Sequence, residues 1–467
     1  MTTGLPGKPS HMRWVLSRLV FFLPQVRSFA RGIAGLHPSK LVFIGYLSYV
    51  VIGWIALCLP FVQKGPGVGS LDNLFVATSA MSTTGLSPVS IADCYNFFGQ
   101  LIILILIQLG GIGYMTLGSF IVLARHTELT PTRSAISKTV FSLPASFKLG
   151  EFIKSVIWFT FVIEALGAAA LYIIFTSAGV QDCVWSAIFH SVSSFCTAGF
   201  GLYNDSFMSF KDDFWLNTVI AALSYLGAIG FIVCLDFWHV LTGRSERVTF
   251  TTKIILWATI WLTIIGTGLL FISEPTIQAA NPADRLLEAF FQCMSAMTTV
   301  GFNTVDIGTL SKASLLLIVV WMVIGSSPSG TGGGVKVTTI SAMIGVMRSA
   351  MVGSKSVHLR GREIPYGRVI TAFAALGFYL TALMIGTYFL QLTERSPFEK
   401  NLFEAASAIG TVGLSMGITA TLTAMGKIII ILLMFCGRVG PLTFSSAMLG
   451  HVLAEPEKPD EDSDLAV

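Results

Sequence analysis

Four short stretches of the chain carry residues that could bind a cation stripped of its water shell. Each stretch follows the pattern Phe-x3-Ser-x3-Thr-x-Gly-[Leu/Phe], and successive glycines lie 114, 102 and 112 residues apart. Rings of backbone carbonyls can replace the waters of an ion in transit, and glycine permits the unusual backbone angles that turn carbonyls inward. The predicted ion-binding residues are the Thr-x-Gly triplets: Thr83, Thr84 and Gly85; Thr197, Ala198 and Gly199; Thr299, Val300 and Gly301; Thr411, Val412 and Gly413.

A short helix must precede each triplet. Phe, Ser and Thr recur four residues apart, which stacks them on one face of a helix that ends just before the glycine. The partial negative charges of four such helix C-termini would stabilise a cation in a cavity between them. A single Ser/Thr-x-Gly could instead mark close packing between membrane helices. Four copies, each at the same place between two apolar segments, favour a pore lined by four loops.

The composition indicates a membrane protein with several spans. Of the 467 residues, 53% are hydrophobic and 12% are charged, whereas soluble domains carry about 25% charge. Crossing about 30 Å of hydrocarbon takes roughly 20 apolar residues. The predicted spans are 41–62, 97–124, 152–177, 214–240, 254–273, about 313–347, 366–392 and 426–450. We therefore expect an all-α membrane protein of four span–short helix–span repeats, with eight spans around a central pore.

The distribution of positive charge predicts how these segments are oriented. Segments 1–40, 125–154, 241–253 and 348–368 hold 19 lysines and arginines, and the alternate segments hold seven. Cytoplasmic loops are enriched in these residues, so we expect both termini inside the cell and the four triplets facing outward. The predicted parts of the chain are a cytoplasmic or interfacial segment (1–40), repeat 1 (41–124), repeat 2 (152–240), repeat 3 (254–347), repeat 4 (366–450) and an acidic tail (451–467).

Other functional classes find little support. A net charge of +4 is too small to point to nucleic acid. Seven scattered cysteines without Cys-x-x-Cys spacing argue against a disulfide framework or a zinc site. His-x3-His does not occur, and the Gly-x-Ser-x-Gly run at residues 413–417 begins at a triplet glycine and so overlaps the fourth copy of the repeated pattern; we therefore expect no enzyme.

The sixth predicted span is interrupted at its centre by a run of small residues from Ser326 to Lys336. Neither apolar half can cross a bilayer alone, so the helix must break at membrane depth. Non-helical backbone is tolerated there only where it is buried in protein or lines a watery path. We expect a gating loop beneath the triplets, in the third repeat only, with a simple packing kink as the alternative. The predicted gate residues are Gly330, Thr331, Gly332, Gly333, Gly334, Lys336 and, from the last span, Arg438.

Arg438 lies within the last predicted span, where an unpaired charge is costly. Facing the pore, its guanidinium would repel cations and set a barrier to flux. Buried elsewhere, it would need an acidic partner, and both readings stay open. The candidate partners are Glu164, Asp236 and Glu404. The position nine residues before each triplet glycine varies, with Val76, His190, Gln292 and Glu404, which suggests packing against neighbours and not a metal ligand.

The chain resembles the Ktr/Trk/HKT superfamily of potassium transporters, and within it the bacterial KtrB-type membrane subunits. The motifs that carry the resemblance are the four triplets, the run Ser329 to Lys336, and Gly437-Arg438-Val439-Gly440-Pro441. The resemblance implies a K+-channel-like fold, potassium selectivity through the filter glycines including Gly85, a gating loop in the sixth span and a pore-facing Arg438. It also implies a homodimer, a separate KtrA-like nucleotide-binding ring in the cytoplasm, and uptake that is often sodium-dependent.

We expect K+ uptake across a bacterial plasma membrane, down the electrochemical gradient. The alternative within transport is a secondary transporter coupled to Na+ or H+. Such coupling would favour acidic residues at mid-membrane depth, and Glu164 and Asp236 are the two candidates.

Overall fold

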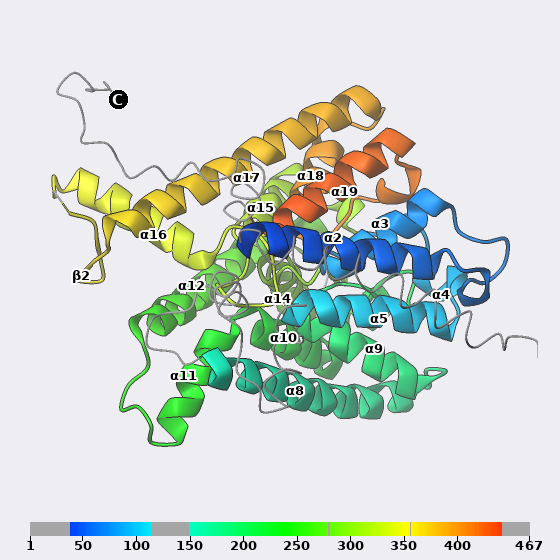
Figure 1. Ribbon diagram of the computed structural model, residues 1–467, viewed down its shortest axis with the longest axis horizontal. Helices are drawn as coiled ribbons and strands as arrows, with labels where there is room; N and C mark the ends of the chain where they lie inside the picture. The colour runs from blue at the N-terminus through cyan, green and yellow to red at the C-terminus, as the bar shows by residue number, and fades with distance from the viewer. Residues whose placement is uncertain (1–37, 114–148, 279–280, 355, 441–467) are drawn as a thin grey trace, which may run out of the picture.

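The computed structural model describes residues 38–113, 149–278, 281–354 and 356–440. The predicted interfacial segment before residue 38 and the acidic tail lie outside these residues. Within them the chain is helical, apart from a small antiparallel hairpin of β1 (His358–Leu359) and β2 (Arg362–Glu363). This hairpin joins two long helices at one end of the molecule (Figure 1).

Apolar helices of 11 to 29 residues lie in the predicted spans. They are α2 (Pro38–Leu57), α5 (Phe97–Ile112), α8 (Leu149–Ser177), α10 (Phe214–Ala228), α11 (Phe231–Leu241), α12 (Phe250–Ser273), α15 (Lys312–Val323), α16 (Val337–Met351), α17 (Tyr366–Thr393) and α19 (Ala424–Val439). Three of them, together with the bent pair α10 and α11, are long and apolar enough to cross a membrane. The predicted ends of the second and eighth spans lie outside the described residues.

A separate helix of 12 to 17 residues, called a short helix below, precedes each Thr-x-Gly triplet, as the residue spacing predicts. These helices are α3 (Ser70–Met81), α9 (Cys183–Phe195), α14 (Pro282–Thr298) and α18 (Phe398–Gly410). The motif phenylalanine of each is fully buried and anchors the helix in the core. Minor elements complete the fold: α4 (Ile91–Cys94), α13 (Pro275–Gln278) and the 3-10 turns Pro60–Val62, Met208–Phe210, Ile307–Thr309 and Thr419–Thr421.

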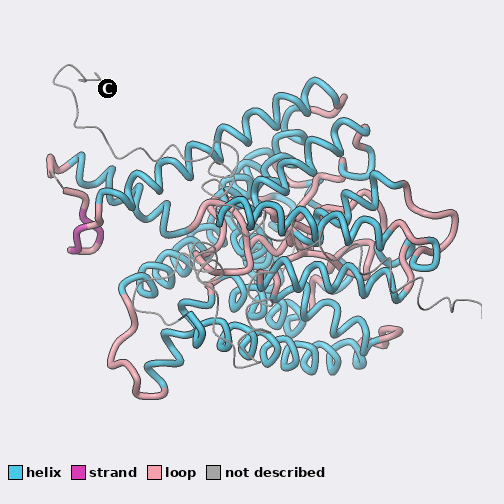
Figure 2. The backbone as a smooth tube through the Cα atoms, in the orientation of Figure 1, coloured by secondary structure: helices cyan, strands magenta, loops and turns pink. Residues whose placement is uncertain are grey.

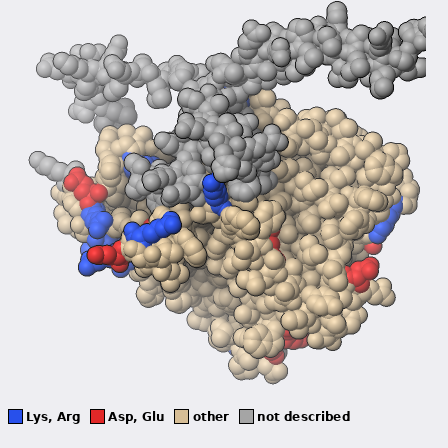
Figure 3. Space-filling model, turned by 60° about the horizontal axis from the view of Figure 1, so that its bottom comes forward, with Lys and Arg blue, Asp and Glu red and all other residues tan. Residues whose placement is uncertain are grey.

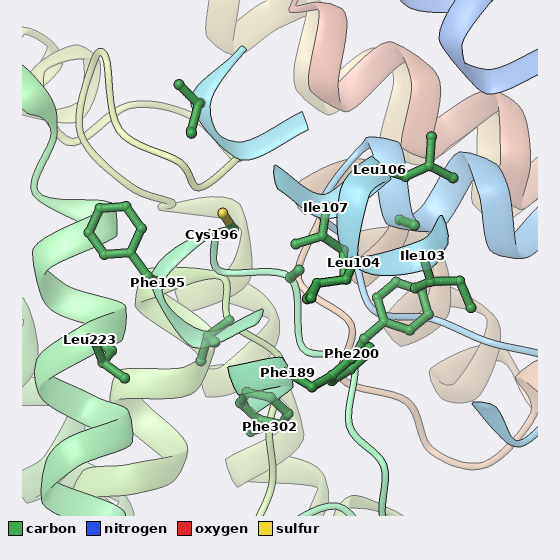
Figure 4. Packing of buried hydrophobic residues seen from close by; sticks show 14 of the residues in the cluster. Ile103, Leu104, Leu106, Ile107, Phe189, Phe195, Cys196, Phe200, Leu223 and Phe302 are labelled. Atoms are coloured by element: carbon green, nitrogen blue, oxygen red, sulfur yellow. The ribbon is translucent and has the colours of Figure 1, made fainter. Parts of the chain in front are cut away.

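The short helices and the loops lie inside a shell of longer helices. Figure 2 shows irregular backbone gathered at the centre of the molecule, with helices around it. Buried hydrophobic residues form two clusters, one mainly from α2 to α11 and one mainly from α12 to α19. In the first cluster, Ile103 and Ile107 of α5 pack near Phe189 of α9 (Figure 4).

The outer surface is apolar around the middle of the molecule and charged at its ends. Figure 3 shows Lys, Arg, Asp and Glu concentrated at two ends, with few charges between them. Large hydrophobic side chains such as Trp158, Ile173 and Trp261 are about half exposed or more on this surface. Apolar surface of this extent is expected where lipid, not water, surrounds the protein.

The prediction that only the third repeat has a broken helix is wrong. In the second repeat, α10 and α11 meet at a bend of 92°. Gly230 provides the break because its φ of +95° is accessible to glycine, and an added Cβ would lie against the carbonyl oxygen of Pro328. A glycine inside an apolar run does not by itself reveal a bend, since the contact that requires it comes from a segment about 100 residues away.

Candidate functional site

The four Thr-x-Gly triplets form a closed ring. Each triplet glycine lies against the next triplet along the chain. The atom it meets there is the carbonyl oxygen of the middle residue, and the two are so close that no side chain would fit between them. The contacts run in chain order and return to the start: Gly85 to Ala198, Gly199 to Val300, Gly301 to Val412, and Gly413 to Thr84. Only glycine permits this approach, which explains why all four copies require it.

The backbone of each triplet adopts an unusual, repeated conformation. The threonines have φ of 52°, 49°, 61° and 47°, and the glycines have φ of 94°, 66°, 79° and 100°, in chain order. Positive φ is rare for a β-branched residue, and strain of this kind costs about 1–3 kcal/mol per residue. Four strained threonines in equivalent places indicate a functional backbone geometry.

The amide groups of the triplets point back to the short helices. The N–H of the residue between Thr and Gly donates to the carbonyl of the motif serine: Thr84 to Ser79 at 2.8 Å, Ala198 to Ser193 at 2.8 Å, Val300 to Ser295 at 3.1 Å, and Val412 to Ser407 at 2.9 Å. These amides are therefore all engaged with the short helix of their own repeat.

The motif serine has a role that its spacing alone did not indicate. The hydroxyls of Ser79 and Ser407 accept hydrogen bonds from the N–H groups of Gly85 and Gly413, at 3.1 and 3.0 Å. The Ser295 hydroxyl donates instead to the carbonyl of Phe302 at 2.5 Å. These serines therefore hold the triplet and the residues beside it onto the short helix. The Ser193 hydroxyl is buried with no hydrogen-bond partner in the described part of the chain.

The variable position nine residues before the glycine is also engaged with the segment after the ring. His190 accepts the N–H of Leu202 at its Nε2, at 3.2 Å.

The third and fourth repeats use different atoms for the same connection. The Gln292 side-chain amide donates to the Thr304 hydroxyl at 3.2 Å. The Glu404 carboxylate accepts from the Ser415 hydroxyl at 2.7 Å and from the Thr419 hydroxyl. In three repeats, different side chains at this position thus bind the segment that follows the triplet. The differences in residue type hid this common role in the sequence. Val76 of the first repeat has no polar group to do the same.

The loop between α15 and α16 lies directly beneath the ring and touches it at all four threonines. The Thr83 hydroxyl donates to the carbonyl of Thr331 at 3.4 Å, and the hydroxyls of Thr197 and Thr331 lie 3.2 Å apart. The N–H of Gly333 donates to the Thr299 hydroxyl at 3.1 Å. At the fourth threonine, a Cβ on Gly333 would collide with the Thr411 hydroxyl.

The break between α10 and α11 holds this loop from the side. The N–H groups of Ser327 and Thr331 donate to the carbonyls of Ala228 and Gly227, at 3.0 and 3.1 Å. In return, the N–H of Phe231 donates to the carbonyl of Ser329 at 3.3 Å. The carbonyls and amides left unpaired by the bend are therefore satisfied by the loop, so the two irregular segments depend on each other.

Lys336 folds back onto the loop. Its Nζ donates to the Gly332 carbonyl at 2.8 Å, so its charge neutralises part of the dipole of the loop from within. Gly334 closes the loop with φ of +71°, and Gly330 packs against the carbonyl of Ala228.

Arg438 joins the loop to the first repeat. Its guanidinium donates to the carbonyls of Thr331 and Gly110.

The acidic partners considered for Arg438 are engaged elsewhere. Glu164 accepts from Gln108 at 3.0 Å, Asp236 accepts from the Thr252 hydroxyl at 2.6 Å, and Glu404 accepts from Ser415. Among the described residues Arg438 therefore forms no ion pair, and none of these three candidates is its partner. A cavity of about 810 Å³ lies below the loop, with Tyr46, Lys336, Tyr379 and Arg438 among its lining residues.

Glycines in three inner helices position the short helices, and sequence reasoning missed this role. Gly110, Gly227 and Gly437 lie against the carbonyl oxygens of Met81, Phe195 and Ile409, each two residues before a triplet threonine. A second glycine three residues later has positive φ and ends the helix: Gly113, Gly230 and Gly440. The signal was a Gly-x-x-Gly spacing that recurs at a similar distance after each of these three triplets.

Comparisons with known proteins agree with this geometry. The family model described as TrkH, cation transport protein, matches residues 49–453. The chain is 34% identical over 446 residues to the Ktr system potassium uptake protein B of Vibrio alginolyticus, covering 94% of this chain and 96% of that protein. It is 33% identical to the potassium/sodium uptake protein NtpJ of Enterococcus hirae, over 89% of this chain and 93% of the relative.

A solved structure supports the fold. The crystal structure of the potassium transporter TrkH from Vibrio parahaemolyticus superimposes with a TM-score of 0.68 at 20% identity, covering 86% of this chain and 84% of that one. The matching family and the matching structure are those of membrane transporters and not of enzymes. The protein is a multi-pass membrane protein that belongs to the TrkH/Ktr family of cation transport proteins.

Proposed function

We propose that the protein takes up K+ across a bacterial plasma membrane through a filter made by the four Thr-x-Gly triplets. The observation that carries this proposal is the closed ring of glycine-to-carbonyl contacts, with four threonines at positive φ beneath it. The printed names of the relatives, a potassium uptake protein and a potassium/sodium uptake protein, support K+ as the substrate. An inside-negative potential supplies about 2.3 kcal/mol per charge per 100 mV.

The proposed architecture has eight spans in four repeats, with the boundaries 41–124, 152–240, 254–347 and 366–450. The helices at the predicted spans, and a short helix before each triplet, support this division. The excess of Lys and Arg in alternate segments supports cytoplasmic termini and triplets that face outward. In that orientation the partial negative charges at the C-termini of α3, α9, α14 and α18 favour a cation at the ring.

The proposed ion ligands are carbonyl oxygens of the triplets and the threonine hydroxyls below them. Carbonyls bind K+ through dipoles, so the ion is stabilised but can still leave. The serine clamps and the residues nine before the glycines would keep the ring at a size that suits K+. Gly85 in the first triplet supports K+ over Na+, as the family resemblance implies.

The proposed gate is the loop Gly330–Lys336 together with Arg438. The loop contacts all four triplet threonines from below, so an ion leaving the ring would meet Thr331 and Gly333. Arg438 donates to the loop at Thr331 and adds a positive charge above the cavity, which resists cation entry until the loop moves. We further propose a homodimer, a KtrA-like nucleotide-binding ring as cytoplasmic regulator, and Na+-dependent activation, all on the family resemblance.

A coupled secondary transporter receives less support. It would need acidic groups on the ion path, and the two candidates lie in other networks. Asp236 accepts from the N–H of Thr249 and the hydroxyl of Thr252, and so supports the start of α12. Glu164 accepts from Gln108 of α5.

The test is ion flux through the purified full chain in liposomes. Vesicles loaded with KCl and placed in low-K+ medium generate an inside-negative potential if the protein conducts K+, and this potential draws in external 86Rb+. We expect 86Rb+ to accumulate in loaded vesicles and not in protein-free ones, and external K+ to compete better than Na+. Failure to pass any monovalent cation would overturn the proposed function.

A further inference from the structure

The hairpin between α16 and α17 holds two arginines against the aromatic face of α12. The Cζ of Arg360 lies 5.2 Å from the Trp257 ring centroid, and the Cζ of Arg362 lies 5.1 Å from the Phe250 ring centroid. Such cation–π contacts fix a guanidinium in place but leave its N–H donors free. Among the residues that the structure describes, neither arginine side chain has a hydrogen bond or an ion pair.

The position of Trp257 sets the depth of this arginine pair relative to the bilayer. Trp257 and Trp261 are 46% and 48% exposed, and the same face of α12 continues into exposed Ile260 and Ile264. This face is apolar along its length, as expected for contact with lipid. Trp257 lies in the first third of α12, and tryptophan toward the end of a membrane helix marks the interface between hydrocarbon and headgroups. Arg360, over Trp257, therefore lies at headgroup level, and Arg362 lies over Phe250 at the start of the same helix.

A third cation completes the group. Lys253 is exposed and lies four residues before Trp257, on the same face of α12. The hairpin carries one acidic residue, Glu363, which is exposed and forms no ion pair with a described residue. Two guanidiniums over two rings of α12, and one ammonium from the same face of that helix, thus form a basic group with a single carboxylate on the hairpin.

We propose that Lys253, Arg360 and Arg362 form a binding site for the phosphate of an anionic phospholipid. Guanidinium groups present paired N–H donors that match phosphate oxygens. Clusters of Lys and Arg beside a membrane helix attract anionic headgroups. A membrane partner is favoured over an acidic soluble protein because the arginines lie on a lipid-facing aromatic row, and not on a surface that projects away from the helices.

The site is connected to the loop beneath the ring. The N–H of His358 in the hairpin donates to the Ser349 hydroxyl of α16 at 3.0 Å, and α16 begins directly after Lys336 of the loop. A lipid held by the hairpin would therefore stabilise the position of the half-helix that follows the proposed gate. The lipid site rests on the proposed membrane orientation in one respect only, the assignment of the lipid to the cytoplasmic leaflet.

The test is lipid binding to the delipidated full chain, measured by native mass spectrometry without any transport readout. The probe is phosphatidylglycerol, with phosphatidylcholine as the neutral comparison. We expect the double variant R360Q/R362Q to bind phosphatidylglycerol on the order of tenfold more weakly, with phosphatidylcholine binding unchanged. The control is R244Q/R247Q, which removes the same charge from another basic segment without an aromatic stack, and should keep most of the affinity.

A conservative pair separates phosphate recognition from charge. R360K/R362K keeps both charges but loses the paired donors, so its phosphatidylglycerol affinity should fall between wild type and R360Q/R362Q. Unchanged thermal melting of the three variants in detergent shows that they fold. Equal phosphatidylglycerol binding by wild type and R360Q/R362Q, or an equal loss in R244Q/R247Q, overturns the proposal. This experiment measures lipid binding and not ion flux. A negative result would therefore overturn the lipid site without bearing on the proposed transport function, which is tested by 86Rb+ uptake.

Discussion

At the scale of single residues, the ring depends on side chains that never need to touch an ion. The motif serines clamp two of the four triplets through their glycine N–H groups, and the residues nine positions before the glycines secure the segment after the ring. The backbone that they hold is strained at four threonines, so it would relax if the clamps were removed. Selectivity should therefore respond to residues behind the ring.

The serine clamp can be tested within the chain itself. Ser407→Ala leaves the part-buried Gly413 N–H without its acceptor, which costs about 1 kcal/mol. We expect a lower melting temperature and a weaker preference for K+ over Na+ in 86Rb+ competition.

Ser193→Ala is the matched control for this substitution. The Ser193 hydroxyl has no partner among the described residues, so its removal should leave both quantities close to wild type. Equal effects of the two substitutions would show that the serine hydroxyls do not hold the ring.

Glu404 allows a second test because its partners are two hydroxyl donors. Glu404→Gln keeps an oxygen that can accept from Ser415, whereas Glu404→Leu removes both acceptors from a fully buried position. We expect the leucine variant to lose K+ preference in competition assays and the glutamine variant to retain most of it. Loss of preference in the glutamine variant alone would contradict this assignment.

At the scale of elements, the interrupted sixth span is the feature that the sequence predicted best. Two apolar halves separated by a run of serines and glycines appear as α15 and α16, with the loop between them. The bend between α10 and α11 was missed because Gly230 sits in an otherwise apolar run, and its reason is a contact with Pro328. A local sequence pattern reveals a helix break that consists of many small residues. It does not reveal a break at a single glycine when the contact that requires the glycine comes from a distant loop.

The loop should act as an obstruction to ions. Deleting Thr331–Gly334 removes the contacts with all four triplet threonines and the acceptor of Arg438. We expect the variant to show a higher basal 86Rb+ uptake in liposomes than wild type. If the variant melts normally and its 86Rb+ uptake equals that of wild type, the loop does not act as a gate.

At the scale of the whole molecule, four copies of a motif become a ring through contacts between neighbouring repeats. The sequence identified the twelve triplet residues, but it could not order them in space, because spacing within a copy carries no information about its neighbours. The structure closes the ring between the fourth and first repeats, where Gly413 meets Thr84 and Lys427 pairs with Asp72 at 2.5 Å. The two core clusters also each contain residues from the other half of the chain. Phe75 of the first repeat lies in the cluster formed mainly by the later repeats, and Phe302 of the third repeat lies in the cluster formed mainly by the earlier ones.

The central claim is that this ring selects K+, and the first triplet tests it most directly. Gly85 has φ of +94° and touches the second repeat at Ala198, so Gly85→Ser adds a side chain where the ring has no space. The control is Gly377→Ser on α17, where an added Cβ meets nothing within 4 Å. The measurement is competition of external K+ and Na+ against 86Rb+ uptake in liposomes. The account predicts that Gly85→Ser loses preference for K+ while Gly377→Ser keeps it; an unchanged preference in a folded, conducting Gly85→Ser protein would contradict it.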